Sequence, residues 1–221
     1  MRISILTYIF GIFILLLSFE LNAQTNEMEM NDNRICKDFI ASSEFKVKIN
    51  GQSKTENEIN LIIEKTEGNR YSIYILNKTN DSITISKQDW SLYLIQEAKD
   101  KNGNWKPIEY WQYATCGNSY LSNKLEPNGV LKTESIAYNG NFETEIRFKF
   151  LNGKKIYYSS SVTGKINENQ FNLPNDIKTK WPVRIIAKTI SDQTIRDVIF
   201  LDPNGTEKLM AELNVAIDGA F

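Results

Sequence analysis

Residues 142–150 carry the pattern that most restricts the fold of this chain. Every second position is apolar or threonine: Phe142, Thr144, Ile146, Phe148 and Phe150. The positions between them are charged, and a period of two over this length fits a half-buried strand and not a helix. Asn-Gly pairs at 139–140 and 152–153 flank the segment and supply the positive φ that two-residue hairpin turns require. The pattern predicts an antiparallel strand whose partner returns through residues 155–160.

Short apolar alternations separated by turn residues continue over much of the chain. Further strands are expected at 45–49, 59–63, 71–75 and 83–85. Glu126-Pro127-Asn128-Gly129 is a turn signature, because proline fixes φ and glycine allows the left-handed conformation. Many short strands with turns about every ten residues are typical of an immunoglobulin-like or fibronectin-III-like antiparallel β-sandwich. We therefore expect an all-β domain over residues 36–174.

Residues 175–221 form a less regular C-terminal extension. Residues 183–190 have the pattern of a strand, whereas Ile195, Val198 and Ile199 fit helical spacing as well as an extended chain. Residues 206–213 are equally ambiguous. We favour a strand and a hairpin packed on the sandwich, with a partly helical extension as the alternative.

The first 23 residues have the composition of a secretory signal peptide. Arg2 gives a positive start, an apolar run follows from Ile3 to Leu17, and Ala23 is a small residue at the cleavage position. The run is shorter than the roughly 20 residues that a membrane-spanning helix needs, which disfavours an uncleaved anchor. We expect export to the periplasm or the exterior, with no membrane span after cleavage. Residues 24–35 are polar and aperiodic, which predicts a flexible lead.

Composition excludes several functional classes. The chain contains no histidine, which removes Ser-His-Asp and Cys-His catalysis and histidine zinc ligation. A net charge of −1 gives no general attraction to nucleic acids or anionic membranes. We expect no cofactor, no metal and no nucleic-acid partner.

The two cysteines of the chain are Cys36 and Cys116. An even pair in an exported protein predicts a structural disulfide, with two separate thiols as the alternative. In the chain-entropy model a bridge between them would stabilise the fold by about 4.5 kcal/mol. Because Cys36 precedes most of the sandwich, we expect the disulfide to lie at the periphery of the sandwich.

Four stretches between residues 97 and 150 support a resemblance: EAKDKNGNWKPIEYW, CGNSY, LEPN and YNGNFETEIRFKF. They resemble a group of secreted, uncharacterised proteins of Bacteroidota. The resemblance covers roughly residues 57–173 and implies an immunoglobulin-like or fibronectin-III-like sandwich. It implies no activity, so no functional residues are transferred from it.

The segment from residue 105 to 120 is dense in aromatic side chains. Such side chains on a sheet face could stack on sugar rings or anchor a peptide, and the alternative is that they fill the core. The candidate ligand-binding residues are Trp105, Tyr110, Trp111 and Tyr113. Trp111 is the leading candidate for ligand binding. In a regular strand it shares a face with Trp105, and the two indoles would form one exposed platform. Pro107 between them is able to break that register.

Two acidic patterns have simple structural explanations. Residues 100–104 resemble the start of a calcium loop but lack the glycine and glutamate that complete one. We expect a hairpin turn there, between strands at 92–98 and 105–111. Glu97 and Glu109 could face each other across that hairpin as a glycosidase pair, but nothing in the sequence fixes a cleft between them.

Three functions remain open after these exclusions. The first is a non-enzymatic exported binding or accessory module of the cell envelope, with an unknown protein or glycan as its partner. The second is a protease inhibitor or peptide binder that uses an edge strand or a loop. The third is a small carboxylate-dependent carbohydrate-active enzyme.

Overall fold

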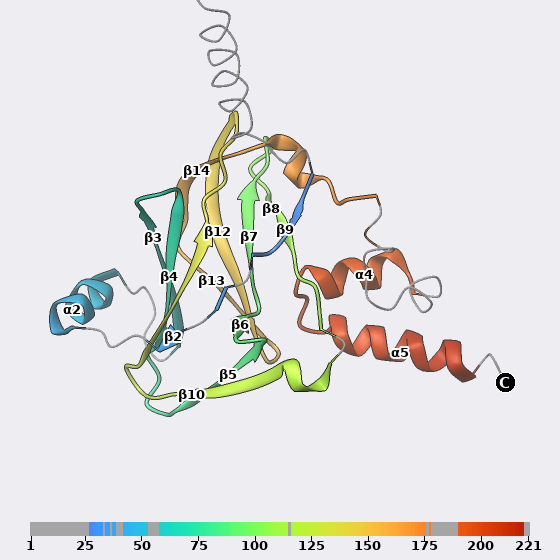
Figure 1. Cartoon of the computed structure of the whole chain (residues 1–221), viewed down its shortest axis with the longest axis horizontal. Helices are drawn as coiled ribbons and strands as arrows, with labels where there is room; N and C mark the ends of the chain where they lie inside the picture. Colours follow the sequence, from blue (N-terminus) through green and yellow to red (C-terminus); the bar gives the residue numbers. More distant parts are fainter. Residues whose placement is uncertain are drawn as a thin grey trace, which may run out of the picture.

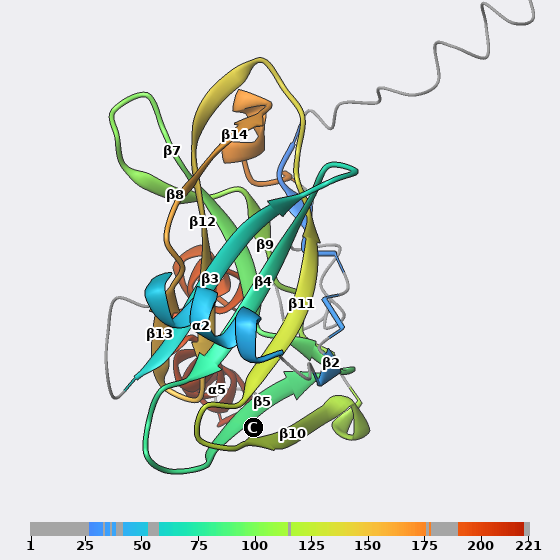
Figure 2. The same ribbon diagram turned by 90° about the vertical axis from the view of Figure 1, so that its left-hand side faces the viewer.

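The computed structural model describes residues 27–32, 34–35, 37–38, 42–52, 58–114, 116–175, 177 and 190–218. Strands dominate these residues and form several sheets that are mainly antiparallel (Figure 1). The larger two sheets lie face to face, with β3, β4 and β11 in front of β7 and β12 in Figure 2. The expectation of a mainly β fold is confirmed.

The four-stranded sheet has the order β2-β11-β4-β3. Its strands are β2 (Lys37–Asp38), β11 (Val130–Ile136), β4 (Arg70–Asn77) and β3 (Ile59–Thr66). The five-stranded sheet has the order β13-β12-β7-β8, and β14 pairs with the other end of β12. Its strands are β13 (Lys155–Tyr158), β12 (Phe142–Asn152), β7 (Leu94–Lys99), β8 (Trp105–Pro107) and β14 (Val162–Ile166).

Strand β12 confirms the alternating pattern of the sequence. Ile146, Phe148 and Phe150 are buried between the two large sheets, while Phe142 is only partly buried. β13 pairs with β12 after a turn at Gly153, which has φ +61° as expected. Gly140 differs, because its φ is not positive and a Cβ there would lie 2.1 Å from the backbone of Ile166. Gly140 therefore allows a close approach of two chain segments and not a left-handed turn.

Smaller sheets extend this framework at two places. The three-stranded sheet β10-β5-β6, at the bottom of Figure 1, comprises β10 (Tyr120–Leu125), β5 (Ile83–Gln88) and β6 (Ser91–Leu92). The strands β1 (Glu29–Met30) and β9 (Glu109–Tyr110) form a parallel pair. Two short 3₁₀ turns, η1 (Gly117–Ser119) and η2 (Glu168–Phe171), connect elements.

The predicted strand at 45–49 is wrong, because this segment lies in helix α2 (Ser43–Gln52). Ser42 caps its start by accepting a hydrogen bond from the backbone N–H of Phe45. Phe45 and Ile49 are four residues apart, so they share one helix face and pack on the outer face of the four-stranded sheet. Val47, which a strand would place beside them, is 72% exposed.

The preference for a strand and a hairpin in the C-terminal extension is also wrong for residues 192–218. They form helices α4 (Asp192–Ile199) and α5 (Gly205–Asp218), at the right of Figure 1. Ile195, Val198 and Ile199 lie on the buried face of α4, and Ser191 caps its start. The predicted strand at 183–190 lies outside the described residues except for Ile190. None of the described helices is long and apolar enough to cross a bilayer.

The N-terminal lead is ordered where the structure describes it, which corrects the expectation of a flexible segment. Met28 is buried, and Arg34 is fully buried. β1 pairs with β9, and Ile35 forms a bridge with Ser91. The predicted signal peptide at 1–23 lies outside the described residues.

Candidate functional site

Trp105 lies in a cross-strand stack on the outer face of the five-stranded sheet. The guanidinium of Arg147 lies 4.3 Å from the ring centroid of Trp105 and 3.9 Å from that of Tyr158. Glu97 accepts hydrogen bonds from this guanidinium at 2.7 and 2.6 Å. We call these four residues the Arg147 stack. It uses the Trp105 ring to hold a cation of the same chain.

Tyr110 and Trp111 are covered by the C-terminal helices. Tyr110 is 8% exposed and packs with Ile195 and Ile199. Trp111 is 2% exposed, and its backbone N–H donates to the carbonyl of Ile199 at 2.8 Å. Trp105 and Trp111 therefore do not form one exposed platform. β8 ends at Pro107, so Trp105 and Trp111 do not belong to one regular strand, and the alternation of faces does not extend from one to the other.

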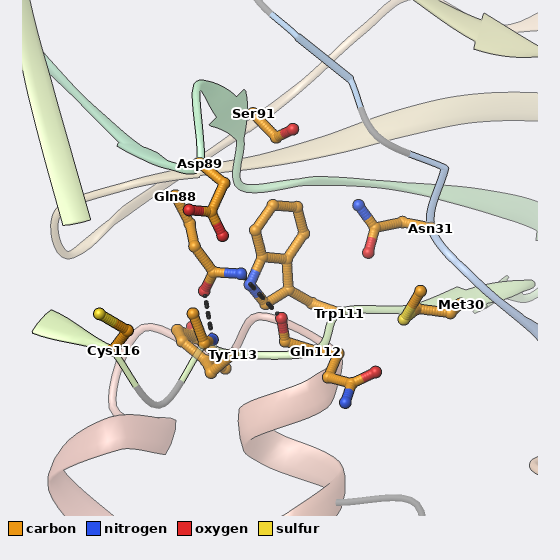
Figure 3. Close-up of a pocket in the computed structure, with 10 residues that line it drawn as sticks. Met30, Asn31, Gln88, Asp89, Ser91, Trp111, Gln112, Tyr113 and Cys116 are labelled. Carbon is orange, nitrogen blue, oxygen red and sulfur yellow. Dashed lines mark hydrogen bonds between the residues drawn. The ribbon is translucent and has the colours of Figure 1, made fainter. Parts of the chain in front are cut away.

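Trp111 and Tyr113 nevertheless line a pocket, which we call the Trp111 pocket. Its volume is about 350 Å³. Figure 3 draws the residues that line it. Three chain segments form its wall: residues 30–31 of the N-terminal segment, residues of the β5–β6 turn, and residues from 111 to 116. The pocket therefore lies where parts of the chain that are distant in sequence meet, which is typical of ligand sites.

Gln88 fixes one wall of the pocket. Its side-chain amide donates to the carbonyl of Gln112 at 2.9 Å and accepts from the backbone N–H of Ala114 at 2.9 Å. The hydroxyl of Tyr120 donates to the carbonyl of Ala114 at 2.6 Å. These bonds hold segment 111–116 against β5 and β10, so the wall is formed without a ligand.

The indole of Trp111 stands between Asp89 and Asn31 (Figure 3). It packs on Tyr93 with ring centroids 4.9 Å apart. Its Nε1–H is buried and has no hydrogen-bond partner among the described residues. A buried donor without a partner costs about 1–3 kcal/mol. A ligand oxygen that reached this atom would recover that loss.

The turn between β5 and β6 has an uncommon backbone. Asp89 and Trp90 have φ +49° and +67°, in the left-handed region that bulky side chains rarely adopt. Trp90 is 55% exposed. The carboxylate of Asp89 is exposed and forms no hydrogen bond or ion pair within the described residues. The turn therefore presents one ring and one unpaired charge beside the pocket.

The charge on the lining of the pocket is negative. Asp89 is the only charged residue among those that line it. Burial, offset in part by a hydrogen bond from Thr206, raises the pKa of Tyr113 to about 12. Burial and the charge of Asp89 also raise the pKa of Tyr120. Both hydroxyls are therefore neutral at physiological pH, and the carboxylate is the one formal charge.

Exposed apolar residues lie next to the residues that line the pocket. Met30 (47% exposed) lines it, whereas Ile35 (53%), Trp90 (55%) and Tyr120 (45%) neighbour lining residues in sequence or in strand pairing, and we call these four residues the rim. Ile35 bridges to Ser91 and Tyr120 pairs with Gln88, which places both beside lining residues. Four of the nine large, exposed apolar residues in the described chain thus gather here. Such clustering is a mark of binding surfaces.

A second polar centre, which the sequence analysis missed, lies in the interior. Arg34 and Glu109 are both fully buried and form an ion pair. Gln96 and Tyr138 donate to Glu109 at 2.8 and 2.9 Å. Burial opposes the charge of Arg34, but Glu109 and Asp32 outweigh that effect and raise its pKa. Every charge of this centre is neutralised by the protein itself, which indicates a structural role.

The proposed glycosidase pair is not assembled. Glu109 bonds to the side chain of Gln96, whereas Glu97 bonds to Arg147 in the outer stack. Gln96 and Glu97 are successive residues of β7, so their side chains point to opposite faces of the sheet. The two carboxylates therefore do not share a cleft.

Residues 100–104 form the expected turn of the β7–β8 hairpin. Asp100 accepts hydrogen bonds from the backbone N–H groups of Asn102 and Asn104, both at 2.9 Å. Gly103 has φ +80°. Within the described part of the chain, no group of three or more acidic or cysteine side chains is arranged to hold a metal ion.

Cys116 lines the Trp111 pocket, where its thiol is exposed and free. Cys36 lies outside the described residues. The predicted bridge is therefore not tested by the described residues, and the pairing stays a prediction.

No protein-family model matches the chain, and no curated protein matches its sequence.

Proposed function

We propose that the chain is an exported, non-enzymatic binding module of the cell envelope, with the Trp111 pocket as its ligand site. One observation carries this proposal: an unpaired carboxylate lines a preformed pocket, and a cluster of exposed apolar residues lies next to it. Exposed apolar side chains cost solubility unless a partner covers them. Two of the four candidate ligand-binding residues, Trp111 and Tyr113, line this pocket.

An immunoglobulin-like topology is part of this proposal, and the strand order supports it. The neighbours β3-β4-β11 follow the order A-B-E, and β8-β7-β12-β13 follow C′-C-F-G. In the sequence, β5 lies in the connection that precedes β7, and β10 lies in the connection that follows β9. These two strands pair with each other and do not extend the A-B-E sheet. Such sandwiches often serve as binding modules, with ligand sites on loops at their ends.

Export is supported by the signal-peptide pattern of residues 1–23 and by the resemblance to secreted proteins of Bacteroidota. Cleavage after Ala23 would leave every described residue in the mature chain. Met28, Arg34 and Ile35 would then hold the new N-terminal region on the domain.

A peptide binder is the second candidate, and strand β10 favours it. β10 ends the three-stranded sheet, and its outer edge has no partner strand among the described residues. Its one charged side chain is Lys124, so little charge on this edge opposes the addition of a further strand.

Site-specific photo-crosslinking tests the proposed site. A photoreactive phenylalanine analogue is placed at Tyr120 on the pocket rim and, as a matched control, at Tyr158 on the outer sheet face. Both tyrosines are 45% exposed, so the two positions differ in location and not in accessibility. Exported protein with the probe at position 120 is expected to form a discrete adduct in intact cells. Equal adducts at both positions, or none at position 120, would contradict the proposal.

A further inference from the structure

We infer that the Trp111 pocket selects a positively charged nitrogen group, an ammonium or a guanidinium, with Asp89 as its counter-ion. This inference rests on the proposed function, because it names the ligand chemistry of the same site.

The charge distribution is the first argument. The carboxylate of Asp89 lies at the pocket and has no ion-pair partner within the described residues. No lysine or arginine is among the lining residues. Lys87 is the neighbour of Gln88 in β5, so its side chain leaves the strand on the opposite face. A cation entering the pocket would therefore meet attraction from Asp89 and no opposing charge from the wall.

The aromatic walls are the second argument. Trp111 and Tyr113 line the pocket, and Trp90 and Tyr120 lie exposed at its rim. The faces of aromatic rings carry negative charge density and attract cations within about 6 Å of the ring centre. Because the tyrosine hydroxyls are neutral, a cation would be attracted by the faces of the rings and by the carboxylate of Asp89.

The chain itself contains a cation site built from the same parts. In the Arg147 stack, a guanidinium lies between the rings of Trp105 and Tyr158, and Glu97 neutralises it. The Trp111 pocket has rings and a carboxylate but no cation of its own. A ligand cation would complete the same combination of groups.

The remaining polar groups disfavour other ligand classes. An anion would face the charge of Asp89 without a basic partner. A sugar needs several free donors and acceptors for its hydroxyls. Both ends of the Gln88 amide are already bonded to the backbone, and the Nε1–H of Trp111 would satisfy only one sugar oxygen. The Asn31 amide donates to the carbonyl of Asp32 at 3.3 Å. The chemistry therefore favours a cation over a neutral polyhydroxyl ring.

The test monitors the indole N–H signals of the 15N-labelled mature chain by NMR. The chain has four tryptophans, so this spectral region is simple, and Trp→Phe variants assign each signal. The probes are Nα-acetyl-lysine methylamide, Nα-acetyl-arginine methylamide and tetramethylammonium chloride. Nα-acetyl-norleucine methylamide is the uncharged match for the lysine probe, and N-acetylglucosamine represents sugars.

We expect at least one cationic probe to shift the Trp90 and Trp111 signals saturably, while the Trp105 signal stays in place. Asp89→Asn should weaken that binding at least tenfold, because it removes the counter-ion. Asparagine tolerates positive φ well, so this variant keeps the turn. Glu143→Gln, which removes an exposed acidic group from β12, is the matched control and should bind normally.

Two outcomes would overturn the inference, and they have different consequences for the proposed function. If the norleucine or sugar probe binds as well as the cations, and Asp89→Asn has no effect, the pocket is a binding site for a different ligand class. If no probe shifts Trp90 or Trp111 and position 120 gives no adduct in cells, both the inference and the proposed site fail.

Discussion

The guanidinium of Arg34 and the carboxylate of Glu109 form an ion pair in which both side chains are fully buried. Arg34 comes from the N-terminal segment and Glu109 from β9, so the pair fastens that segment to the domain. Arg34 also donates to Ser135 of β11 at 3.1 Å and to the backbone carbonyl of Leu94 in β7. One side chain thus links the N-terminal segment to both large sheets.

Breaking this pair should destabilise the fold strongly. Arg34→Met leaves Glu109 buried without its cation and should lower the free energy of unfolding by about 3–5 kcal/mol. The double variant Arg34→Met/Glu109→Leu removes both charges, so its loss should be smaller than the sum of the single losses by about 1–3 kcal/mol. Urea unfolding of the four proteins measures this coupling. Strictly additive losses would show that the two residues act independently.

Phe148 and Lys149 are adjacent in β12 but act on opposite faces. Phe148→Ala should cost about 3–5 kcal/mol because it opens a cavity in the core. The Nζ of Lys149 donates to the carbonyl of Phe200, the C-cap residue of α4, at 2.7 Å. Lys149→Ala should therefore cost about 1.5 kcal/mol, since a charged hydrogen bond at a helix end is lost.

Hydrogen exchange separates these two effects. Phe148→Ala should accelerate exchange throughout the domain, whereas Lys149→Ala should accelerate it mainly in α4 and α5. Lys65→Ala, on the exposed end of β3, serves as the control for removal of a surface lysine. Exchange in Lys149→Ala that matches the Lys65→Ala control would show that the contact with Phe200 contributes nothing.

The Arg147 stack should contribute to stability and not to ligand capture. Trp105→Ala should lower the free energy of unfolding by roughly 1–2 kcal/mol, because it removes one of the two rings that hold the guanidinium. Thermal unfolding measures this loss. Crosslinking at position 120 should be unchanged in the same variant. A loss of crosslinking would assign Trp105 to the binding site after all.

Glu212 of α5 should make the attachment of the C-terminal helices sensitive to acid. Its carboxylate accepts hydrogen bonds from Thr194 at 2.6 Å and from the backbone and side chain of Ser191 at 2.7 and 2.8 Å. These bonds, that from Thr194 first, lower its pKa below the ordinary value of 4.5. A carboxyl with a depressed folded pKa stabilises the fold fully above about 4.5 and loses that effect as the pH falls through the folded value.

Hydrogen exchange of the α4 amides at pH 7 and at pH 3 measures this dependence. Protection should fall at pH 3 in the wild type, after correction for intrinsic exchange rates. Glu212→Gln should reduce protection already at pH 7 and remove the additional loss at pH 3. An equal pH response in the two proteins would assign the acid sensitivity to another carboxylate.

The Cys36–Cys116 disulfide stays a prediction, since Cys116 is a free cysteine in the structure. Ile35, next to Cys36 in sequence, bridges to Ser91, and Ser91 lines the same pocket as Cys116. Non-reducing mass spectrometry of exported protein is expected to show a Cys36–Cys116 peptide. Two alkylated thiols in folded, exported protein would contradict the bridge.

The sequence was most informative where side-chain periodicity and turn residues agree. β12 and its return through β13 were predicted because the alternation is long and Asn152-Gly153 marks the turn. Residues 45–49 were misassigned because Phe45 and Ile49 fit both a strand face and a helix face in so short a segment. In the extension, Ile195, Val198 and Ile199 carried the helical spacing that the structure shows.

The candidate site was predictable only in part, because tertiary contacts determine exposure. Trp111 and Tyr113 were singled out by aromatic density, but the helices that bury Trp111 are formed some 80 residues later in the chain. Asn31 and Asp89 carried no local signal, since their role depends on the meeting of three distant segments. The Arg34–Glu109 pair was missed for the same reason, as 75 residues separate its members.

The anchoring of Arg34 also sets an order of events during synthesis. Its partners Glu109 and Ser135 follow it by 75 and 101 residues, so the first described segment to be synthesised is among the last that is able to complete its contacts. Until β11 has emerged, neither buried charge has its full set of partners, and the chain gains little from early compaction. Contacts of such long sequence separation slow folding. A chain that closes late stays extended longer, which would suit the export that we propose.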